Sequence, residues 1–222
     1  MSSLIIVESD NDKYFIEKLK DKLGLSNIAV DQPICNMKDI ECLNGLSETK
    51  LISTLKEIRY DKWKKVGIIL DADNVGIEER IKLINKCIKS LDNVPSDFEI
   101  TKINEFIEIT SLDIQICCYI TNISGKGELE TVLRHIKSVD SPHADCLESW
   151  RACLNSKGKV IKDKDFDKFW VNNYLRFDTC SKEEQKQSSL KCRNEIAIKK
   201  DIWDLNNEIL SELKTFLELL SS

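Results

Sequence analysis

The chain has 222 residues, of which 41% are hydrophobic and 32% charged, and its net charge is −5. This balance is typical of a soluble globular protein with one good core, and it argues against a protein that coats nucleic acid with its whole surface. The first apolar run is four residues long and leads into acids, and nothing approaches the roughly 20 apolar residues of a membrane span. The sequence therefore predicts a cytoplasmic protein with no membrane partner.

The predicted elements of the first half alternate between strands and helices. Short apolar runs predict buried strands at residues 4–7, 28–34 and 66–70. Apolar residues at helical spacing predict helices at about residues 11–23, 47–60 and 77–91. A β-α-β-α-β-α order favours a parallel sheet with covering helices.

The second half becomes more helical along the chain. A strand is predicted at residues 114–120, and a glycine-flanked turn leads into a helix at about 128–139. Beyond Pro142, helices are predicted at 144–155, 165–175 and 202–220. We therefore expect an α/β fold with a mostly parallel sheet flanked by helices and a helical C-terminal extension. The expected domains are residues 1–140 and a packed extension at 141–222, or one single domain.

Nine cysteines are present, and no Cys-x-x-Cys pair occurs among them. The number is odd, and the sequence predicts no export signal. We therefore expect free thiols, several of them buried as small apolar groups.

Four carboxylates stand where predicted strands end. Glu8 follows the first strand with Asp12 four residues later, and Asp71 and Asp73 follow the third strand. Because the carboxyl ends of parallel strands share one edge of a sheet, these acids are expected to meet there. Their repulsion and their hard oxygen atoms favour Mg²⁺ or Mn²⁺, as one ion or as two about 4 Å apart. The alternatives are a helix cap at residues 10–12 and a solvated Asp-x-Asp loop.

A third candidate segment follows the predicted strand at 114–120. Lys126 lies between Gly125 and Gly127, and Glu128 and Glu130 open the next helix. Glycines let a phosphate approach the backbone, a lysine can neutralise a transition-state oxygen, and either glutamate can complete a metal shell. The alternative is a flexible turn with a solvated lysine before an acid-rich first helical turn.

Basic residues cluster before the third strand, where Lys64 and Lys65 are candidate contacts to a phosphate backbone, and again at 157–164 and 191–200. Trp63 and Trp170 lie in or near these clusters and are candidates for stacking on bases. A solvated face is the alternative for each cluster.

These segments resemble a known family. Residues 7–12, Val-Glu-Ser-Asp-Asn-Asp, resemble the Val-Glu-Gly-x-x-Asp opening of Toprim domains, and residues 68–73 resemble their second motif. Toprim domains occur in topoisomerases, primases and the overcoming-lysogenization-defect nucleases. Residues 127–130 match a Gly-x-Leu-Glu motif of small stand-alone Toprim-like proteins of unassigned function, and residues 202–217 match their ending. Ser9 stands where the family usually has glycine.

The resemblance implies a Toprim-like fold and a nuclease that needs Mg²⁺ or Mn²⁺ and acts on DNA or RNA. It implies Glu8 as both metal ligand and general acid/base, and Lys126 as a second catalytic residue. The implied metal ligands are Glu8, Asp12, Asp71, Asp73 and Glu130. Anti-phage defence beside an ATPase partner is implied in the same way. The alternatives are phosphoryl transfer on a small nucleotide and an inactive binding or regulatory subunit, and the oligomeric state, a homo-oligomer included, stays open.

Overall fold

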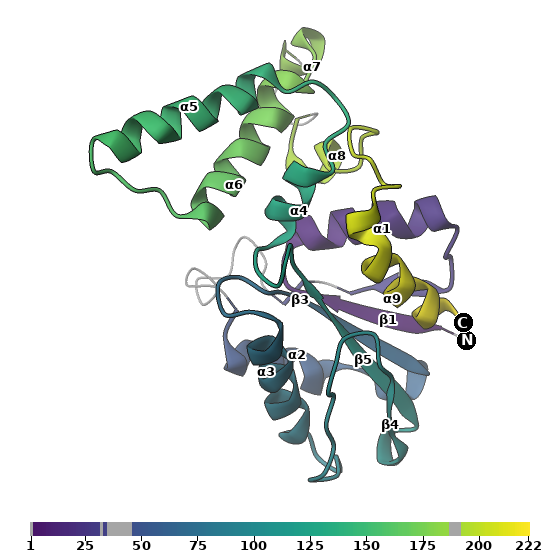
Figure 1. Cartoon of the computed structure of the whole chain (residues 1–222). Coiled ribbons are helices and arrows are strands. Elements are labelled where there is room, and N and C mark those ends of the chain that lie inside the picture. The colour runs from purple at the N-terminus through teal and green to yellow at the C-terminus, as the bar shows by residue number, and fades with distance from the viewer. Residues whose placement is uncertain (1, 32, 35–45, 187–191) are drawn as a thin grey trace.

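The computed structural model describes residues 2–31, 33–34, 46–186 and 192–222. Within these ranges the chain forms an α/β fold in which helices cover both faces of a five-stranded sheet (Figure 1). The strands are β1 (Ser3–Val7), β2 (Ile28–Val30), β3 (Lys65–Asp71), β4 (Ile107–Ile109) and β5 (Ile114–Thr121). Their order is β2-β1-β3-β5-β4, and every neighbouring pair is parallel except β4 with β5. The predicted α/β fold with a mostly parallel sheet is confirmed.

The helices follow the strands in the alternation that the sequence predicts. They are α1 (Asp10–Leu23), α2 (Glu48–Glu57), α3 (Ile77–Lys89), α4 (Leu129–His135), α5 (Pro142–Ser156), α6 (Asp163–Asn173), α7 (Lys182–Lys186), α8 (Asn194–Ala197) and α9 (Ser211–Ser221). Short 3₁₀ turns occur at Tyr60–Lys62, Thr110–Leu112 and Glu208–Leu210, and a π-helical turn at Tyr174–Asp178 continues α6. None of the described helices is long and apolar enough to cross a bilayer.

Two predicted helices are shorter than expected, for one shared reason. The helix predicted at 128–139 ends at His135, and the helix predicted at 202–220 begins only at Ser211. Between them, Lys137 and Trp203 form an antiparallel bridge, flanked by hydrogen bonds of 3.0 Å from Ser138 N to Ile202 O and 2.6 Å from Asp204 N to Ile136 O. These backbone groups pair with each other, so neither segment continues as a helix. The strand predicted at 28–34 likewise ends early, at Val30.

Alternate side chains of the strands pack into two different cores. Ile5 and Val7 of β1 face the core formed with α1, α4 and α9, whereas Ile6 faces the core formed with α2 and α3. The first core continues without a break into the C-terminal helices, where Phe166 and Trp170 of α6 are fully buried in it. A division at residue 140 stays a prediction, and the two parts share apolar packing.

The connections of β1 create a switch point in the sheet. β1 lies between β2 and β3, and α1 covers one face of the sheet while α2 covers the other. The chain therefore passes from β1 to β2 on one side of β1, and then crosses over to form β3 on the other side of β1. In open parallel sheets, ligands bind outside the carboxyl ends of the two strands at such a point, here β1 and β3.

The expectation that the cysteines are free thiols is wrong for two of them. Cys180 and Cys192 form a disulfide, with their Cα atoms 6.0 Å apart, which is an ordinary separation for that bond. Cys180 follows the turn after α6 and Cys192 lies just before α8, and cysteine spacing alone does not predict that these two positions meet. The described free cysteines are Cys87, Cys117, Cys118, Cys146 and Cys153.

Candidate metal centre

Glu8 and Asp71 meet at the switch point. Glu8 is the first residue after β1 and Asp71 is the last residue of β3, and the two strands are paired in parallel. The Asp71 N–H donates a hydrogen bond of 3.2 Å to Glu8 Oε2, and the Leu129 N–H, at the start of α4, donates one of 3.2 Å to Asp71 Oδ1. Both carboxylates are only 8% exposed. Two segments some sixty residues apart thus place acids side by side.

Asp12 and Glu130 join Glu8 and Asp71 to complete a group of four acids. One carboxylate oxygen of each acid accepts a hydrogen bond from a nearby residue. Asp12 lies in the first turn of α1, where its Oδ2 accepts hydrogen bonds from Ser9 Oγ at 2.6 Å and Ser9 N at 2.9 Å. This is a capping box, so the capping alternative holds for that oxygen. Glu130 Oε1 accepts a hydrogen bond of 3.0 Å from Asn11 Nδ2. Ser9 has an extended backbone, so the position needs no glycine.

Burial makes the negative charge of this group unfavourable. Desolvation, together with the nearby charges of Glu8 and Glu130, raises the pKa of Asp12 to about 7 despite its bonds from Ser9. Desolvation, reinforced by the charges of Asp12 and Glu8, also raises the pKa of Asp71 well above its usual value. The pKa of Glu8 is raised by burial, although the Asp71 N–H and the Arg80 charge oppose the shift. Added positive charge would stabilise all three carboxylates.

The group fits a hard divalent cation. Among the described residues, no lysine or arginine forms an ion pair with Glu8, Asp12, Asp71 or Glu130, although all four are buried. Buried carboxylates without a counter-charge are unfavourable, and oxygen ligands are those that Mg²⁺ and Mn²⁺ prefer. The carboxylate oxygens are too far apart to bind one ion as they stand, because no three described carboxylates have ligand atoms all within 4.8 Å of one another. Binding would therefore require some of these side chains to turn inward.

Asp73 lies near enough to this group to contribute to the raised pKa of Glu8, but its carboxylate is paired with two cations. The expectation that Asp71 and Asp73 project to one side assumes an extended backbone, but Asp73 has a left-handed φ of 50°. A pair of backbone hydrogen bonds joins Asp73 to Gly127, and its carboxylate forms ion pairs with Arg80 and with Lys164 Nζ, the latter at 2.6 Å. A role for Asp73 as a metal ligand stays a prediction, and it would require release from these two cations.

A cleft of about 260 Å³ lies beside the acids, between α4 and α6. Its lining includes Glu128, which is 2% exposed and has Oε2 3.2 Å from Nζ of both Lys164 and Lys168. The other oxygen of Glu128 has no hydrogen-bond partner within the described part of the chain. Burial raises the pKa of Glu128 to about 7, with a contribution from Glu130. Glu128 thus connects the cleft electrostatically with the four acids.

The lysine that pairs with carboxylates beside the four acids is Lys164, not the predicted Lys126. Lys126 is exposed on a tight turn in which Ser124 and Gly125 both have positive φ, so the alternative of a turn is correct, and its side chain lines the rim of the cleft. Lys164, from α6, bridges Asp73 and Glu128. Burial opposes its charge, but these ion pairs raise the pKa of Lys164 overall.

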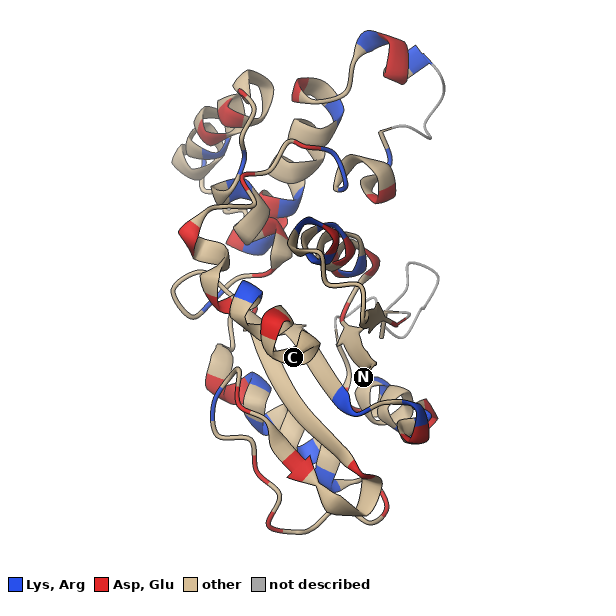
Figure 2. Ribbon diagram, turned by 90° about the vertical axis from the view of Figure 1, so that its right-hand side faces the viewer, with Lys and Arg blue, Asp and Glu red and all other residues tan. Residues whose placement is uncertain are grey.

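Lys64 and Lys65 lie at the opposite end of the sheet from the acids. Lys65 begins β3, which Asp71 ends, so about 20 Å of strand separates them. Lys65 Nζ donates to Leu219 O at 2.8 Å, and Lys64 pairs with Asp113. A contact of these lysines with nucleic acid stays a prediction, for a face remote from the acids. Basic and acidic segments are interspersed over the helices in Figure 2, so any basic footprint is local.

The fold and the site define an α/β protein with four buried carboxylates at the switch point of a parallel sheet. The chain belongs to the family described as "Protein of unknown function (DUF3226)", which matches residues 2–222. No curated protein and no solved structure matches the chain.

Proposed function

We propose that the protein is a nuclease with a Toprim-like sheet that hydrolyses phosphodiester bonds of nucleic acid with Mg²⁺ or Mn²⁺. The observation that carries the proposal is the group of four buried carboxylates at the switch point, which form no ion pair with any lysine or arginine that the structure describes. The Toprim-like motifs at residues 7–12 and 68–73 support it, because they supply three of those acids: Glu8, Asp12 and Asp71.

Each acid has a defined role in this proposal. Asp71 and Glu8 hold one cation from adjacent strand ends, and Glu130 and the free oxygen of Asp12 complete the site for one or two ions. The Lewis acidity needed for attack on phosphorus would come from the bound cation. By the resemblance, Glu8 would also act as general acid/base during hydrolysis.

The cleft supplies positive charge for the substrate. Lys164 is held at its inner side by Asp73 and Glu128, and Lys126 lies at its rim. In this proposal a phosphate displaces these carboxylates from Lys164, whose charge then stabilises the transition state. An ATPase partner and a role in anti-phage defence belong to the proposal through the resemblance alone, and a cytoplasmic location stays the expectation drawn from the sequence.

The second candidate is a binding or regulatory subunit in which the acids no longer catalyse. The capping bonds from Ser9 to Asp12 Oδ2 favour it, because they occupy one of the oxygens that a metal would need. The separation of the carboxylate oxygens favours it too.

Cleavage assays on single- and double-stranded DNA and RNA separate the two candidates. We expect cleavage that depends on Mg²⁺ or Mn²⁺ and falls by at least about 10²-fold in Asp71→Asn. Asp113→Asn is the matched control, because Asp113 is exposed, has a left-handed backbone that asparagine also adopts, and pairs with Lys64 far from the acids. Equal activity of Asp71→Asn and the wild type would contradict the proposal. Absence of both cleavage and Mn²⁺ binding would favour the regulatory subunit.

A further inference from the structure

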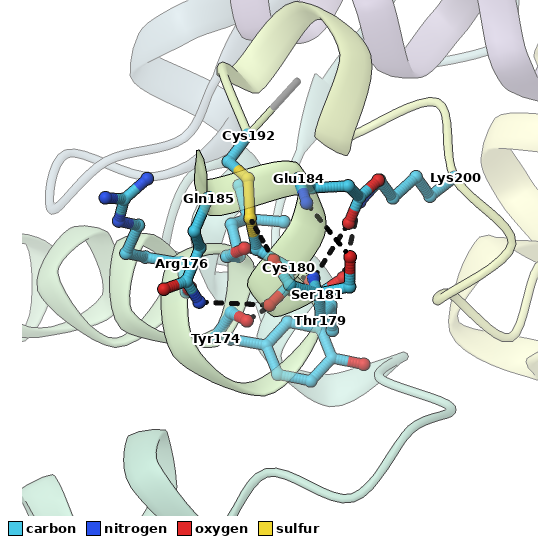
Figure 3. Close-up of a disulfide and its surroundings, with 10 residues drawn as sticks. Tyr174, Arg176, Thr179, Cys180, Ser181, Glu184, Gln185, Cys192 and Lys200 are labelled. Atoms are coloured by element: carbon cyan, nitrogen blue, oxygen red, sulfur yellow. Dashed lines mark hydrogen bonds and ion pairs between the residues drawn. A yellow bond between two sulfur atoms is a disulfide. The ribbon is translucent and has the colours of Figure 1, made fainter. Parts of the chain in front are cut away.

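A disulfide fastens the start of α8 to the end of α6. Cys180 follows the π-helical turn after α6, and Cys192 lies two residues before Asn194, the first residue of α8 (Figure 3). Cys180 is held in place, because Gln185 Nε2 donates a hydrogen bond of 3.1 Å to Cys180 O and Cys180 is only 6% exposed. The Cys192 side is half-buried and continues directly into α8.

α8 touches the candidate metal centre through two amide side chains in series. Asn194 Nδ2 donates a hydrogen bond of 3.2 Å to Asn11 Oδ1, and Asn11 Nδ2 donates one of 3.0 Å to Glu130 Oε1. A glutamate side chain has three rotatable bonds, and the bond from Asn11 selects one orientation of Glu130. Partners that orient a metal ligand in this way strengthen metal binding, because less freedom is lost when the ion arrives.

The disulfide restrains the end of α8 that carries this contact. At the other end, Ala197 and Ile198 are fully buried in the core. At the first end, Glu195 and Ile196 are exposed. Besides the helical backbone bonds to Ala197 and Ile198, the links described there are the Asn194 hydrogen bond and the covalent link at Cys192. Opening the disulfide would therefore free the part of α8 that holds Asn11.

We propose that the Cys180–Cys192 bond is a reversible redox tether that keeps Asn194 on Asn11 and thereby positions Glu130 for a divalent cation. This inference rests on the proposed metal centre. On oxidation, the two thiols lose two protons and two electrons to a small disulfide such as oxidised glutathione, which leaves as two thiols. A dithiol reductant reverses the exchange and becomes a disulfide itself. In the cytoplasm expected above, glutathione and thioredoxin keep most thiols reduced, so a disulfide that forms there is usually transient or redox-sensing.

A zinc site is the competing use of the same residues. Cys180, Glu184 and Cys192 have ligand atoms within 4.8 Å of one another. Glu184, however, forms an ion pair of 2.8 Å with Lys200 and accepts a hydrogen bond of 2.8 Å from Ser181 N, and sulfurs bonded to each other are not thiolate ligands. The geometry therefore favours the tether.

The test compares the full chain after oxidation with oxidised glutathione and after reduction with a phosphine, with the thiol count checked by alkylation and mass spectrometry. We expect reduction to raise amide hydrogen exchange in α8 and in the first turn of α1, and to weaken Mn²⁺ binding about 10-fold. Cys192→Ser should behave like the reduced protein in both states. Asn194→Ala should bind Mn²⁺ weakly in both redox states, because it keeps the disulfide but removes the hydrogen bond from Asn194 to Asn11.

Cys153→Ser is the matched control, because Cys153 is an exposed free thiol of α5, and it should respond to redox state like the wild type. Unchanged exchange and unchanged Mn²⁺ affinity on reduction would overturn the tether. Tight Zn²⁺ binding by the reduced protein, lost in Cys192→Ser, would also overturn it in favour of the competing site. Absence of Mn²⁺ binding in both redox states would overturn the proposed function itself, and with it the role of Glu130.

Discussion

Lys164 and Lys126 are placed differently beside the acids, and single substitutions can test what this difference means. Lys164 is held by Asp73 and Glu128, whereas Lys126 stands exposed at the rim of the cleft. We expect Lys164→Met to lower the turnover of nucleic acid by about 10²-fold and Lys126→Met to lower it by less than about 5-fold, because an oriented charge stabilises a transition state best. Steady-state kinetics with both variants measure this, and circular dichroism checks folding. A larger loss in Lys126→Met would reassign the catalytic lysine.

The raised pKa values of Asp12 and Glu128 predict how stability depends on pH. Both carboxyl groups titrate at about 7 in the folded chain and near 4 when unfolded, so the folded state binds protons more tightly between these values. Their contribution to stability is present below about pH 4 and is lost as pH rises through about 7. Without divalent metal, we expect the Tm to fall by roughly 5 °C between about pH 5.5 and pH 8.

Mg²⁺ should oppose this loss, because it favours the charged carboxylates, and should therefore raise the Tm more at the higher pH. Thermal unfolding with and without Mg²⁺ at both pH values is the measurement. Asp12→Asn should flatten the pH dependence, since it removes one of the two titrating groups. A Tm without metal that stays constant or rises toward pH 8 would contradict the assignment of these buried acids.

All four acids of the group are candidates from the sequence alone, and their role as metal ligands stays a prediction. Glu8 and Asp71 are predicted because each follows an apolar strand, and parallel strands bring their carboxyl ends together. The Asp-x-Asp spacing does not reveal that Asp73 pairs with Arg80 and Lys164, because the backbone turns left-handed there. Lys164 lies in the basic cluster at 157–164, but its contact with Asp73 could not be predicted, because 91 residues separate the two and nothing local predicts how α6 docks.

At the scale of elements, α9 depends on a single glycine in β3. A Cβ on Gly67 would lie 2.7 Å from both Leu220 Cδ1 and Phe216 Cζ, side chains that are buried in α9. We expect Gly67→Ala to destabilise the fold by about 1–3 kcal/mol, because a close-packed core does not accept the extra methyl group. Urea unfolding measures the change. Leu220→Ala should cost less in the Gly67→Ala background than alone, and strictly additive effects would contradict this close packing.

The boundaries of the helices and strands show which parts of the structure a local sequence pattern predicts and which it does not. The apolar runs of β1 and β3 predict buried strands, because both of their faces are covered. The late start of α9 and the early end of α4 were missed, because the bridge between Lys137 and Trp203 joins positions 66 residues apart. The antiparallel edge strand β4 is three residues long, too short for its alternation to be distinguished from a loop.

At the scale of the whole molecule, the sheet and the C-terminal helices act together on one site. The sheet supplies Glu8 and Asp71, α4 supplies Glu130, and α6 supplies Lys164. The first core extends from β1 to α6 without a break, so the position of α6 relative to the sheet is fixed by apolar packing. This explains how a chain with net charge −5 presents positive charge beside its acids.

The most direct test of the account is a crystal of the protein grown or soaked with Mn²⁺ and measured at the manganese absorption edge. The account predicts an anomalous peak between the ends of β1 and β3, about 2.1 Å from carboxylate oxygens of Asp71 and Glu8, and its loss in Asp71→Asn. An anomalous map without a peak at these carboxylates, from crystals in which Glu8 and Asp71 are well ordered, would contradict it.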